Sequence, residues 1–420
     1  MNKLVALPKM AIVPILVLVM LGIDFYVFQA IRTLLRHRNV LFRRLIYGLY
    51  WSVTLTLLIG LFIFYFADET RVGDTLRTII MVSIFMTYFS KLFTLAFVFI
   101  DDTVRLIKWM YRKAFPVKKV KVENGISRSQ FLAKAGLALA AMPVFAVSYG
   151  VVAGAHDYRV RRRRIYLPHL PKSFDGLKIA QISDIHSGSF FNKTAVRRGV
   201  KMLMDEAADL VFFTGDLVND QASEVQEYVD IFGKINAPLG VFSVLGNHDY
   251  GDYIVWESEE AKKQNLAKLK QAHAAMGWRL LLNEHEILEK DGEELAIIGV
   301  ENWGAGGFSK YGDLQKATAG MPHTPVKLLL SHDPSHWEYE VKDTDIDITF
   351  AGHTHGMQFG VEIGDIKWSP VKYRYKHWAG LYQENDRYLY VNRGFGYMGY
   401  PGRIGMPPEI TIIELHKSLI

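Results

Sequence analysis

The chain has 420 residues, contains no cysteine, and is 50% hydrophobic and 22% charged. The lack of cysteine excludes a disulfide-stabilised mini-protein, a thiolate metal site and a cysteine nucleophile, and the apolar composition excludes a disordered chain. Residues 1–164 hold 24 Lys and Arg against 8 Asp and Glu, a net charge of +16, whereas residues 165–420 carry −10. This division argues against a nucleic-acid partner and indicates N-terminal loops that contact anionic membrane lipids.

Four long apolar stretches predict transmembrane helices at residues 11–31, 45–66, 78–100 and 135–155, each with at most one charged residue. A helix needs about 20 residues to cross the hydrocarbon core of a bilayer. We therefore expect a transmembrane region at 1–158, a basic linker at 159–176 and a second domain at 177–420. Asp24 and Lys91 lie inside spans, and they either pair between spans one and three or snorkel independently to an interface.

The orientation follows from Lys and Arg in the short loops. The loops after spans one and three are strongly basic, which places both in the cytoplasm, and the loop at 67–77 has mixed charges. The C-terminal domain is then expected outside, on the periplasmic side of a bacterial inner membrane. The arginines at 159 and 161–164 favour the opposite orientation.

Residues 177–420 alternate short apolar runs with amphipathic stretches, which indicates a layered α/β domain. Strands are expected at 177–182, 210–213, 241–245, 295–300, 326–330, 346–350, 388–391 and 410–415. Helices are expected at 193–206, 222–234 and 259–276.

Polar side chains follow five of these strands: Asp184 and His186; Asp216; Asn247, His248 and Asp249; His332; His353 and His355. Strand ends are where open α/β sheets bind ligands, and imidazole with carboxylate suits divalent cations. In extended chain, Asp184 with His186, or His353 with His355, would point to one side and hold one ion. Each cluster alone has a structural reading as a cap, a turn or a core histidine, but burying all of them without a metal is costly.

The ordered set Asp-x-His, Gly-Asp, Gly-Asn-His-Asp, His and Gly-His-x-His over residues 177–356 resembles the calcineurin-like metallophosphoesterase superfamily. Gly394-Phe395-Gly396, Arg403 and Pro408-Glu409-Ile410 are similar to its membrane-anchored bacterial phosphodiesterase branch, although Met357 stands where that branch often has a second glycine. The resemblance implies a four-layer αββα sandwich with two metal ions. It assigns Asp184, His186 and His355 to one ion, Asn247, His332 and His353 to the other, and Asp216 to both.

Such a centre would use two divalent ions, Mn, Fe or Zn, to supply a bridging hydroxide that attacks phosphorus. His248 has no metal role and is expected to act as general acid or electrostatic stabiliser for the leaving oxygen, with Asp249 orienting its ring. The alternative is that His248 is a structural histidine behind the ligands.

The expected function is therefore a membrane-anchored, dinuclear-metal-dependent phosphoesterase that hydrolyses a phosphomono- or diester, lipid-linked or otherwise part of the cell envelope. Its expected partners are membrane lipids and this substrate. Two alternatives stay open: a lipid diphosphate hydrolase on the cytoplasmic face, or a non-catalytic, metal-stabilised membrane sensor or assembly module.

Two further segments are candidates for a lid or for contact with lipid headgroups, or else for ordinary packing. One is the glycine-rich loop at 301–308. The other is an aromatic and basic segment with Trp368, Tyr373, Tyr375 and Trp378.

Overall fold

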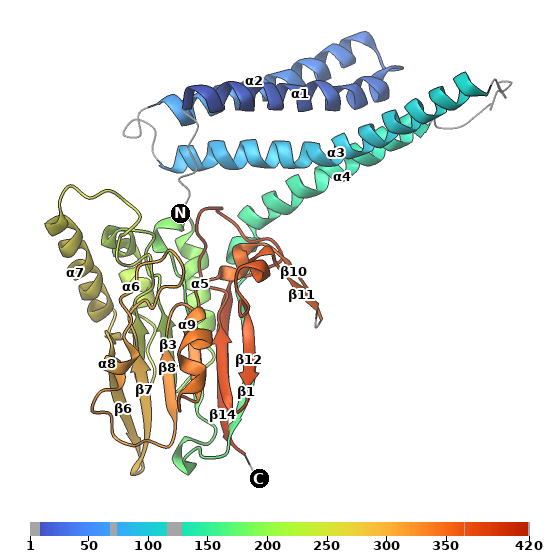
Figure 1. Ribbon diagram of the computed structural model, residues 1–420. Helices are drawn as coiled ribbons and strands as arrows, with labels where there is room; N and C mark the ends of the chain where they lie inside the picture. The colour runs from blue at the N-terminus through green and yellow to red at the C-terminus, as the bar shows by residue number, and fades with distance from the viewer. Residues whose placement is uncertain (1–8, 68–73, 116–127, 365, 419–420) are drawn as a thin grey trace. The chain divides into compact units, whose positions relative to one another are not determined.

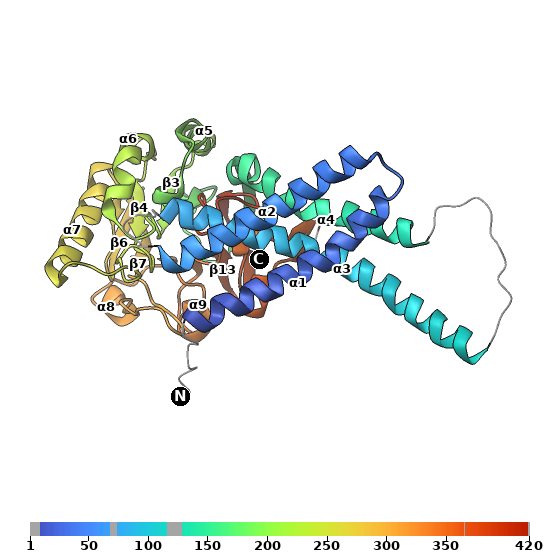
Figure 2. The same ribbon diagram turned by 90° about the horizontal axis from the view of Figure 1, so that it is seen from above.

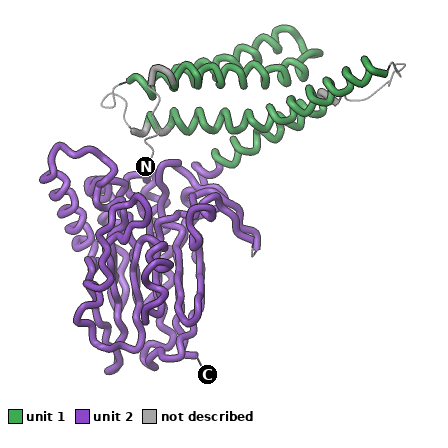
Figure 3. The backbone as a smooth tube through the Cα atoms, viewed as in Figure 1, with its two compact units in different colours: residues 1–148 green, residues 149–420 purple. Residues whose placement is uncertain are grey.

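The computed structural model describes residues 9–67, 74–115, 128–364 and 366–418. The chain divides into two compact units, Met1–Ser148 and Tyr149–Ile420 (Figure 3). Some of the charged loop residues used to predict the orientation, at 68–71 and 118–121, lie outside the described residues.

The first unit consists of long apolar helices, as predicted: α1 (Lys9–Leu35), α2 (Val40–Phe66), α3 (Asp74–Ala114) and most of α4 (Arg128–Val152), whose last four residues belong to the second unit. Each contains a stretch long and apolar enough to cross a membrane. The helices extend beyond the predicted spans, because the polar residues that flank the apolar runs are themselves compatible with helix. α3 in particular continues to Ala114 through a basic segment.

The two ionisable residues inside the spans pair with each other. Lys91 of α3 donates to Oδ1 of Asp24 in α1, whose side chain is fully buried. Two hydroxyl groups complete the cluster, since Tyr50 of α2 donates to Oδ1 at 2.8 Å and Tyr88 of α3 donates to Oδ2 at 2.7 Å. Independent snorkelling is therefore the wrong alternative, and one carboxylate joins three helices.

The second unit contains two six-stranded sheets. The first has the order β1 (Arg159–Leu167), β14 (Glu409–Lys417), β2 (Lys178–Ile182), β3 (Leu210–Thr214), β4 (Val241–Val244) and β5 (Arg279–Leu280). The second has the order β12 (Gly380–Glu384), β13 (Arg387–Val391), β9 (Ile348–Ala351), β8 (Lys327–Leu330), β7 (Glu293–Gly299) and β6 (Glu284–Lys290). β2 to β5 are mutually parallel, and so are β7, β8, β9 and β13.

The sheets pack face to face between two layers of helices. α5 (Lys193–Met204), α6 (Val229–Phe232) and α7 (Glu259–Ala275) contribute to the core beside the first sheet, and α8 (Leu314–Thr318) and α9 (Ser335–Tyr339) to the core beside the second. Figure 2 shows α5 and α6 on one side of the strands and α8 and α9 on the other. Phe212 and Phe350 meet between the sheets with ring centroids 4.9 Å apart. The predicted layered fold is confirmed.

All eight predicted strands are present within two residues of their expected bounds. The main difference is β1, which occupies much of the expected basic linker and pairs in parallel with β14. Ile165 and Leu167 of β1 are buried, whereas most of its arginines point outward. The sequence did not predict this strand, because five of its nine residues are arginines and the alternation of apolar and other residues is confined to the last three positions.

A short antiparallel ribbon of β10 (Val361–Ile363) and β11 (Ile366–Trp368) follows the last metal motif and belongs to neither sheet. The sequence did not predict this ribbon, because each strand has only three residues. It extends away from the sheets in Figure 1.

Candidate metal centre

The polar clusters meet at one edge of the two sheets. Asp184 and His186 follow β2, Asp216 follows β3, and Asn247 to Asp249 follow β4. His332 follows β8, and His353 and His355 follow β9 in the second sheet. Parallel strands bring their carboxyl ends to a common edge, which accounts for the convergence of side chains that are far apart in sequence.

One group of donor atoms consists of Asp184, His186 and His355, all buried. Nε2 of His355 lies 3.1 Å from Oδ1 of Asp184 and 3.0 Å from Nε2 of His186. A second group consists of Asp216, His332 and His353.

The amide oxygen of Asn247 completes the second group. It lies 2.8 Å from Nδ1 of His353 and 3.2 Å from Nε2 of His332. Oδ2 of Asp216 stands between the groups, 3.1 Å from Nε2 of His332 and 3.6 Å from Nε2 of His186. All seven side chains named from the sequence are thus brought together, with Asp216 adjacent to both groups.

The donor set fits two divalent cations. Donors about 2.0–2.2 Å from one tetrahedral ion lie about 3.3–3.6 Å apart, close to most of the separations seen here. Two pairs of imidazole nitrogens face each other: Nε2 of His186 with Nε2 of His355, and Nε2 of His332 with Nδ1 of His353 at 3.3 Å. Each pair has at least one nitrogen lone pair that a cation could accept. A mixed nitrogen and oxygen set suits Mn, Fe or Zn.

The backbone turns sharply at most of the donors. Five of the seven candidate donors have positive φ: Asp184 (51°), His186 (48°), Asp216 (60°), His353 (70°) and His355 (51°). This left-handed conformation is uncommon outside glycine and often marks functional sites. The expected extended geometry is therefore wrong, and as a result His353 and His355 reach different groups instead of sharing one ion.

Two glycines allow the loops to approach the carboxylates. A Cβ on Gly352 would lie 2.0 Å from Oγ of Ser183 and 2.3 Å from Oδ2 of Asp184. A Cβ on Gly246 would lie 2.2 Å from Oδ1 of Asp216. Both positions exclude any side chain, which explains glycine at the start of these two motifs.

Hydrogen bonds on the far side of the rings orient two histidines. Nδ1 of His332 lies 2.7 Å from the carbonyl oxygen of Thr214, and Nε2 of His353 lies 2.8 Å from the hydroxyl of Tyr375. A proton on each of these nitrogens leaves the other nitrogen free to face an ion.

The charges of the centre depend on one another. Burial lowers the pKa of His332, but the carboxylate of Asp216 more than offsets this and raises it to about 10. Conversely, burial raises the pKa of Asp216, whereas His332 and His248 lower it well below its usual range.

His248 lies beside the donors, with its ring centroid 5.1 Å from that of His186. Its Nδ1 lies 2.7 Å from the carbonyl oxygen of Asn219, not near the carboxylate of Asp249. The expectation that Asp249 orients this ring is wrong, because consecutive side chains in this turn point in different directions.

Asp249 instead supports the loop that carries Asp216. Its carboxylate accepts hydrogen bonds from the backbone N–H groups of Gly246 at 2.8 Å, Asp216 at 2.9 Å and Leu217 at 2.8 Å. Burial and the nearby Asp216 raise the pKa of Asp249 to about 7. The carboxylate of Asp249 therefore fixes the backbone of the two loops that carry Asp216 and Asn247.

Aromatic residues that the sequence did not assign to the centre surround it. The hydroxyl of Tyr253 accepts a hydrogen bond from Nδ2 of Asn247 at 2.8 Å, and its ring centroid lies 4.7 Å from that of His248. Phe308, from the glycine-rich loop, meets His353 edge-on at 4.8 Å. Of Tyr253, Phe308 and Tyr375, the sequence indicated only the last two, as parts of the two segments considered for a lid or for contact with lipid headgroups.

Two family models match the chain. The model described as "Probable Calcineurin-like phosphoesterase, transmembrane domain" matches residues 9–155, and the model described as "Calcineurin-like phosphoesterase" matches residues 177–357. The second match contains all seven candidate donors, and the first contains the candidate spans almost completely.

Relatives come from several organisms. The chain is 29% identical over 302 residues to the metallophosphoesterase YkuE of Bacillus subtilis, which covers 70% of this chain and 99% of the relative. It is 30% identical over 293 residues to the "Transmembrane protein with metallophosphoesterase domain" of Danio rerio, covering 67% of this chain and 62% of the relative. It is 27% identical over 297 residues to the UDP-2,3-diacylglucosamine pyrophosphatase LpxG of Chlamydia trachomatis, covering 59% and 86%.

Proposed function

Because the chain belongs to the calcineurin-like metallophosphoesterase superfamily and is a phosphoric ester hydrolase, we propose that it hydrolyses a lipid-linked or other envelope phosphoester at the membrane in which its four helices are embedded. The observation that carries this proposal is the convergence of seven candidate donors, with Asp216 between the two groups. The candidate spans keep the domain next to lipid at all times.

The residues divide their roles as the geometry suggests. Asp184, His186 and His355 would hold one ion, Asn247, His332 and His353 the other, and Asp216 would contact both. When bound, two divalent cations supply Lewis-acid chemistry, activating water and neutralising charge on the phosphoryl oxygens.

His248 is the proposed proton donor to the leaving oxygen. The carbonyl oxygen of Asn219 accepts only a protonated Nδ1, so in the charged ring the proton on Nε2 is the one available for transfer. After transfer, the same carbonyl keeps the neutral ring in its Nδ1–H form. Tyr253 packs on this ring and limits its rotation.

A lipid-linked substrate is supported by a relative and by the rim. LpxG, by its name, acts on a diacylated sugar diphosphate. The rim of the centre here is aromatic, with Phe308 and Tyr253 against the candidate catalytic groups. Aromatic rings suit a substrate with an apolar or sugar portion.

We further propose that the domain lies on the outer side of a bacterial inner membrane. Two strongly basic loops, after spans one and three, favour this side, whereas the single arginine cluster that directly follows the fourth span favours the other. Four of these arginines form ion pairs in the folded domain: Arg159 with Asp157, Arg161 with Glu362, Arg162 with Glu206 and Arg164 with Glu414. The competing proposal is a lipid diphosphate hydrolase on the cytoplasmic face; the name of LpxG supports its diphosphate substrate, and the arginine cluster supports its orientation.

The activity test uses the purified full-length protein with Mn²⁺ and two substrates, an aryl phosphodiester and a lipid diphosphate. Asp216→Asn is expected to lower turnover by at least about a hundredfold, whereas Asp205→Asn, which changes a surface carboxylate paired with Lys201, serves as the matched control. Full activity in the Asp216→Asn protein would refute the proposed centre.

Orientation is tested separately. A cysteine at Glu227, whose side chain is 72% exposed, is offered to a membrane-impermeant reagent in whole cells with the outer barrier opened. Labelling supports the outer side, and labelling only after lysis supports the cytoplasmic alternative. The chain has no native cysteine to interfere.

A further inference from the structure

The β10–β11 ribbon has two chemically different faces. Its register pairs Val361 with Trp368, Glu362 with Lys367 and Ile363 with Ile366. Because side chains alternate along a strand, one face carries only apolar residues: Val361, Ile363, Ile366 and Trp368. The other face carries the charged pair.

The charged face is fixed to the domain and the apolar face is exposed. Glu362 accepts hydrogen bonds from Arg161 at 3.1 Å and from Arg393 at 3.2 Å, and Lys367 donates to the carbonyl oxygen of Ala379. On the opposite face, the side chains of Ile363 and Ile366 are 72% and 73% exposed. A two-stranded ribbon is marginal by itself, so these contacts hold its apolar face outward.

The root of the ribbon is joined to the end of the fourth candidate span. That span runs from Phe131 to His156. Within the second unit, the backbone N–H of Arg403 donates to Gly150 at 3.1 Å, the N–H of Ile404 donates to Gln358 at 2.7 Å, and the N–H of Gly360 donates to Ile404 at 2.9 Å. The ribbon therefore starts beside the C-terminal end of the fourth candidate span, within the second unit.

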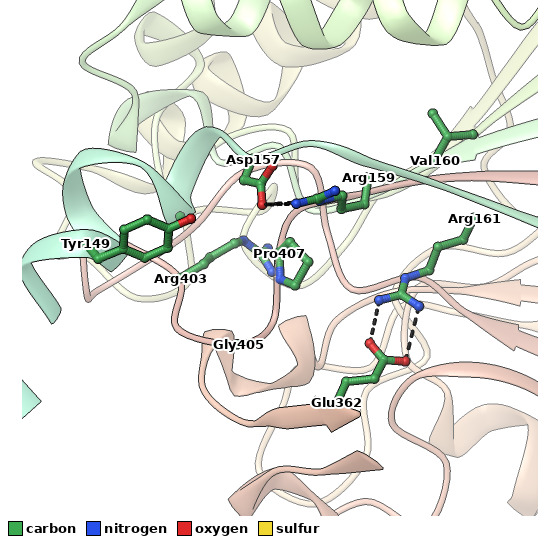
Figure 4. Close-up of a pocket in the computed structure, with 10 residues that line it drawn as sticks. Tyr149, Asp157, Arg159, Val160, Arg161, Glu362, Arg403, Gly405 and Pro407 are labelled. Carbon is green, nitrogen blue, oxygen red and sulfur yellow. Dashed lines mark hydrogen bonds and ion pairs between the residues drawn. The ribbon is translucent and has the colours of Figure 1, made fainter. Parts of the chain in front are cut away.

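A cavity of about 430 Å³ lies between these parts. Figure 4 shows Tyr149 from the end of the span, Arg159, Arg161 and Arg403 around it, with Glu362 of the ribbon on one wall. Arg159 is paired with Asp157, Arg161 is paired with Glu362, and Arg403 is buried, so these guanidinium groups fix the base of the ribbon to the domain.

The chain from β11 onward is positively charged. Residues 366–376 contain four Lys and Arg and no Asp or Glu. Lys372, Tyr373 and Arg374 are exposed. Basic residues next to exposed aromatic and aliphatic side chains are typical of surfaces that lie on an anionic bilayer.

We propose that the apolar face of the β10–β11 ribbon lies in the boundary between headgroups and acyl chains of the membrane that holds the four spans, with the exposed Lys372 and Arg374 of the following segment facing lipid phosphates. The contact itself is independent of hydrolysis. Its use in delivering a lipid-linked substrate to the centre, which lies six residues before the ribbon at His355, rests on the proposed function.

The test uses the full-length protein with a cysteine in place of Ile363, labelled with an environment-sensitive fluorophore and reconstituted into nanodiscs of phosphatidylcholine and phosphatidylglycerol. The matched control is Asp386→Cys, at the exposed turn between β12 and β13. Near-ultraviolet circular dichroism and thermal unfolding establish that both labelled proteins are folded, whatever their activity.

At Ile363 we expect a blue-shifted emission, quenching by lipids that carry a nitroxide on the acyl chain, and protection from aqueous iodide. At Asp386 we expect none of these. Equal access of iodide to both positions would overturn the proposal. Loss of the blue shift in nanodiscs that hold a single copy would also overturn it, since a second copy of the chain would then be the partner.

Discussion

Replacement of Asp249 by asparagine tests whether this buried carboxylate organises the centre without touching the ions. In addition to the three N–H groups already described, Val218 approaches Oδ1 at 3.4 Å, so each carboxylate oxygen faces two backbone donors. Asparagine keeps one oxygen and turns an NH₂ group toward the other two donors, which then lose their acceptor.

The magnitude follows from the number of bonds lost. Above its pKa of about 7 Asp249 is mainly ionised, and a hydrogen bond to a charged group contributes about 1.5–3 kcal/mol. At such pH values the loss of two hydrogen bonds destabilises the native arrangement of the loops by about 3–6 kcal/mol. The loops carry Asp216 and Asn247, and a loss of about 3 kcal/mol corresponds to about a hundredfold in affinity. We expect Asp249→Asn to weaken Mn²⁺ binding by at least about that factor.

The assay is a Mn²⁺ titration followed by both metal binding and hydrolysis. Part of the activity of Asp249→Asn returns at saturating Mn²⁺, because all seven donors remain, whereas Asp216→Asn does not recover. The matched control is Asp313→Asn, which removes a carboxylate that accepts the N–H of Lys316 at the start of α8. Unchanged Mn²⁺ affinity in Asp249→Asn would refute the positioning role.

Three other outcomes are expected. Tyr375→Phe removes the acceptor of the Nε2 proton of His353 and should weaken Mn²⁺ binding about 10–100-fold; an unchanged metal titration would contradict this role. Burial lowers the pKa of His273 to about 3 from 6.5, so the unfolded chain binds an extra proton below pH 6.5 and the free energy of unfolding falls by about 2 kcal/mol at about pH 5. In chemical unfolding experiments across this pH range, the free energy of unfolding of His273→Gln should therefore depend less on pH than that of the parent protein. An equal pH dependence in both proteins would exclude His273 as its source. Lys91→Met leaves the buried Asp24 without its cation and should cost about 3–5 kcal/mol; adding Asp24→Asn should restore part of this in a thermal unfolding assay, and purely additive effects would argue against coupling.

The parts of the fold that the sequence predicts well are those whose signal is burial. β3 is five consecutive apolar or small residues with every side chain buried, and such runs identify a central strand without further information. β1 was not predicted, for two reasons. Most of its arginines lie on the exposed side of an edge strand, so its residues do not form an apolar run. Its partner β14 is about 250 residues away in the sequence. Local pattern cannot report a partner at that distance.

The candidate site divides in the same way. The donors are predictable because metal chemistry restricts residue type and strand ends restrict position. The contacts around them are not, because the turns decide where each ring points. Asn219, which holds His248, and Tyr253, which covers it, are ordinary loop residues in sequence. Sequence adjacency suggested Asp249 for the first of these roles and was misleading.

The left-handed backbone at five donors restricts how this centre can change in evolution. If these residues bind the ions as proposed, each position must supply a metal-binding atom and also accept a backbone conformation that costs about 1 kcal/mol or more for most residues. Glycine would remove the backbone strain but has no side-chain donor atom, and a residue with a bulkier side chain would increase the strain at positive φ. A change of donor type to favour another cation would thus need a different turn as well as a new side chain. Natural variation should therefore concentrate in the aromatic rim, where substitutions can change the preferred substrate while the two metal ions keep their donors.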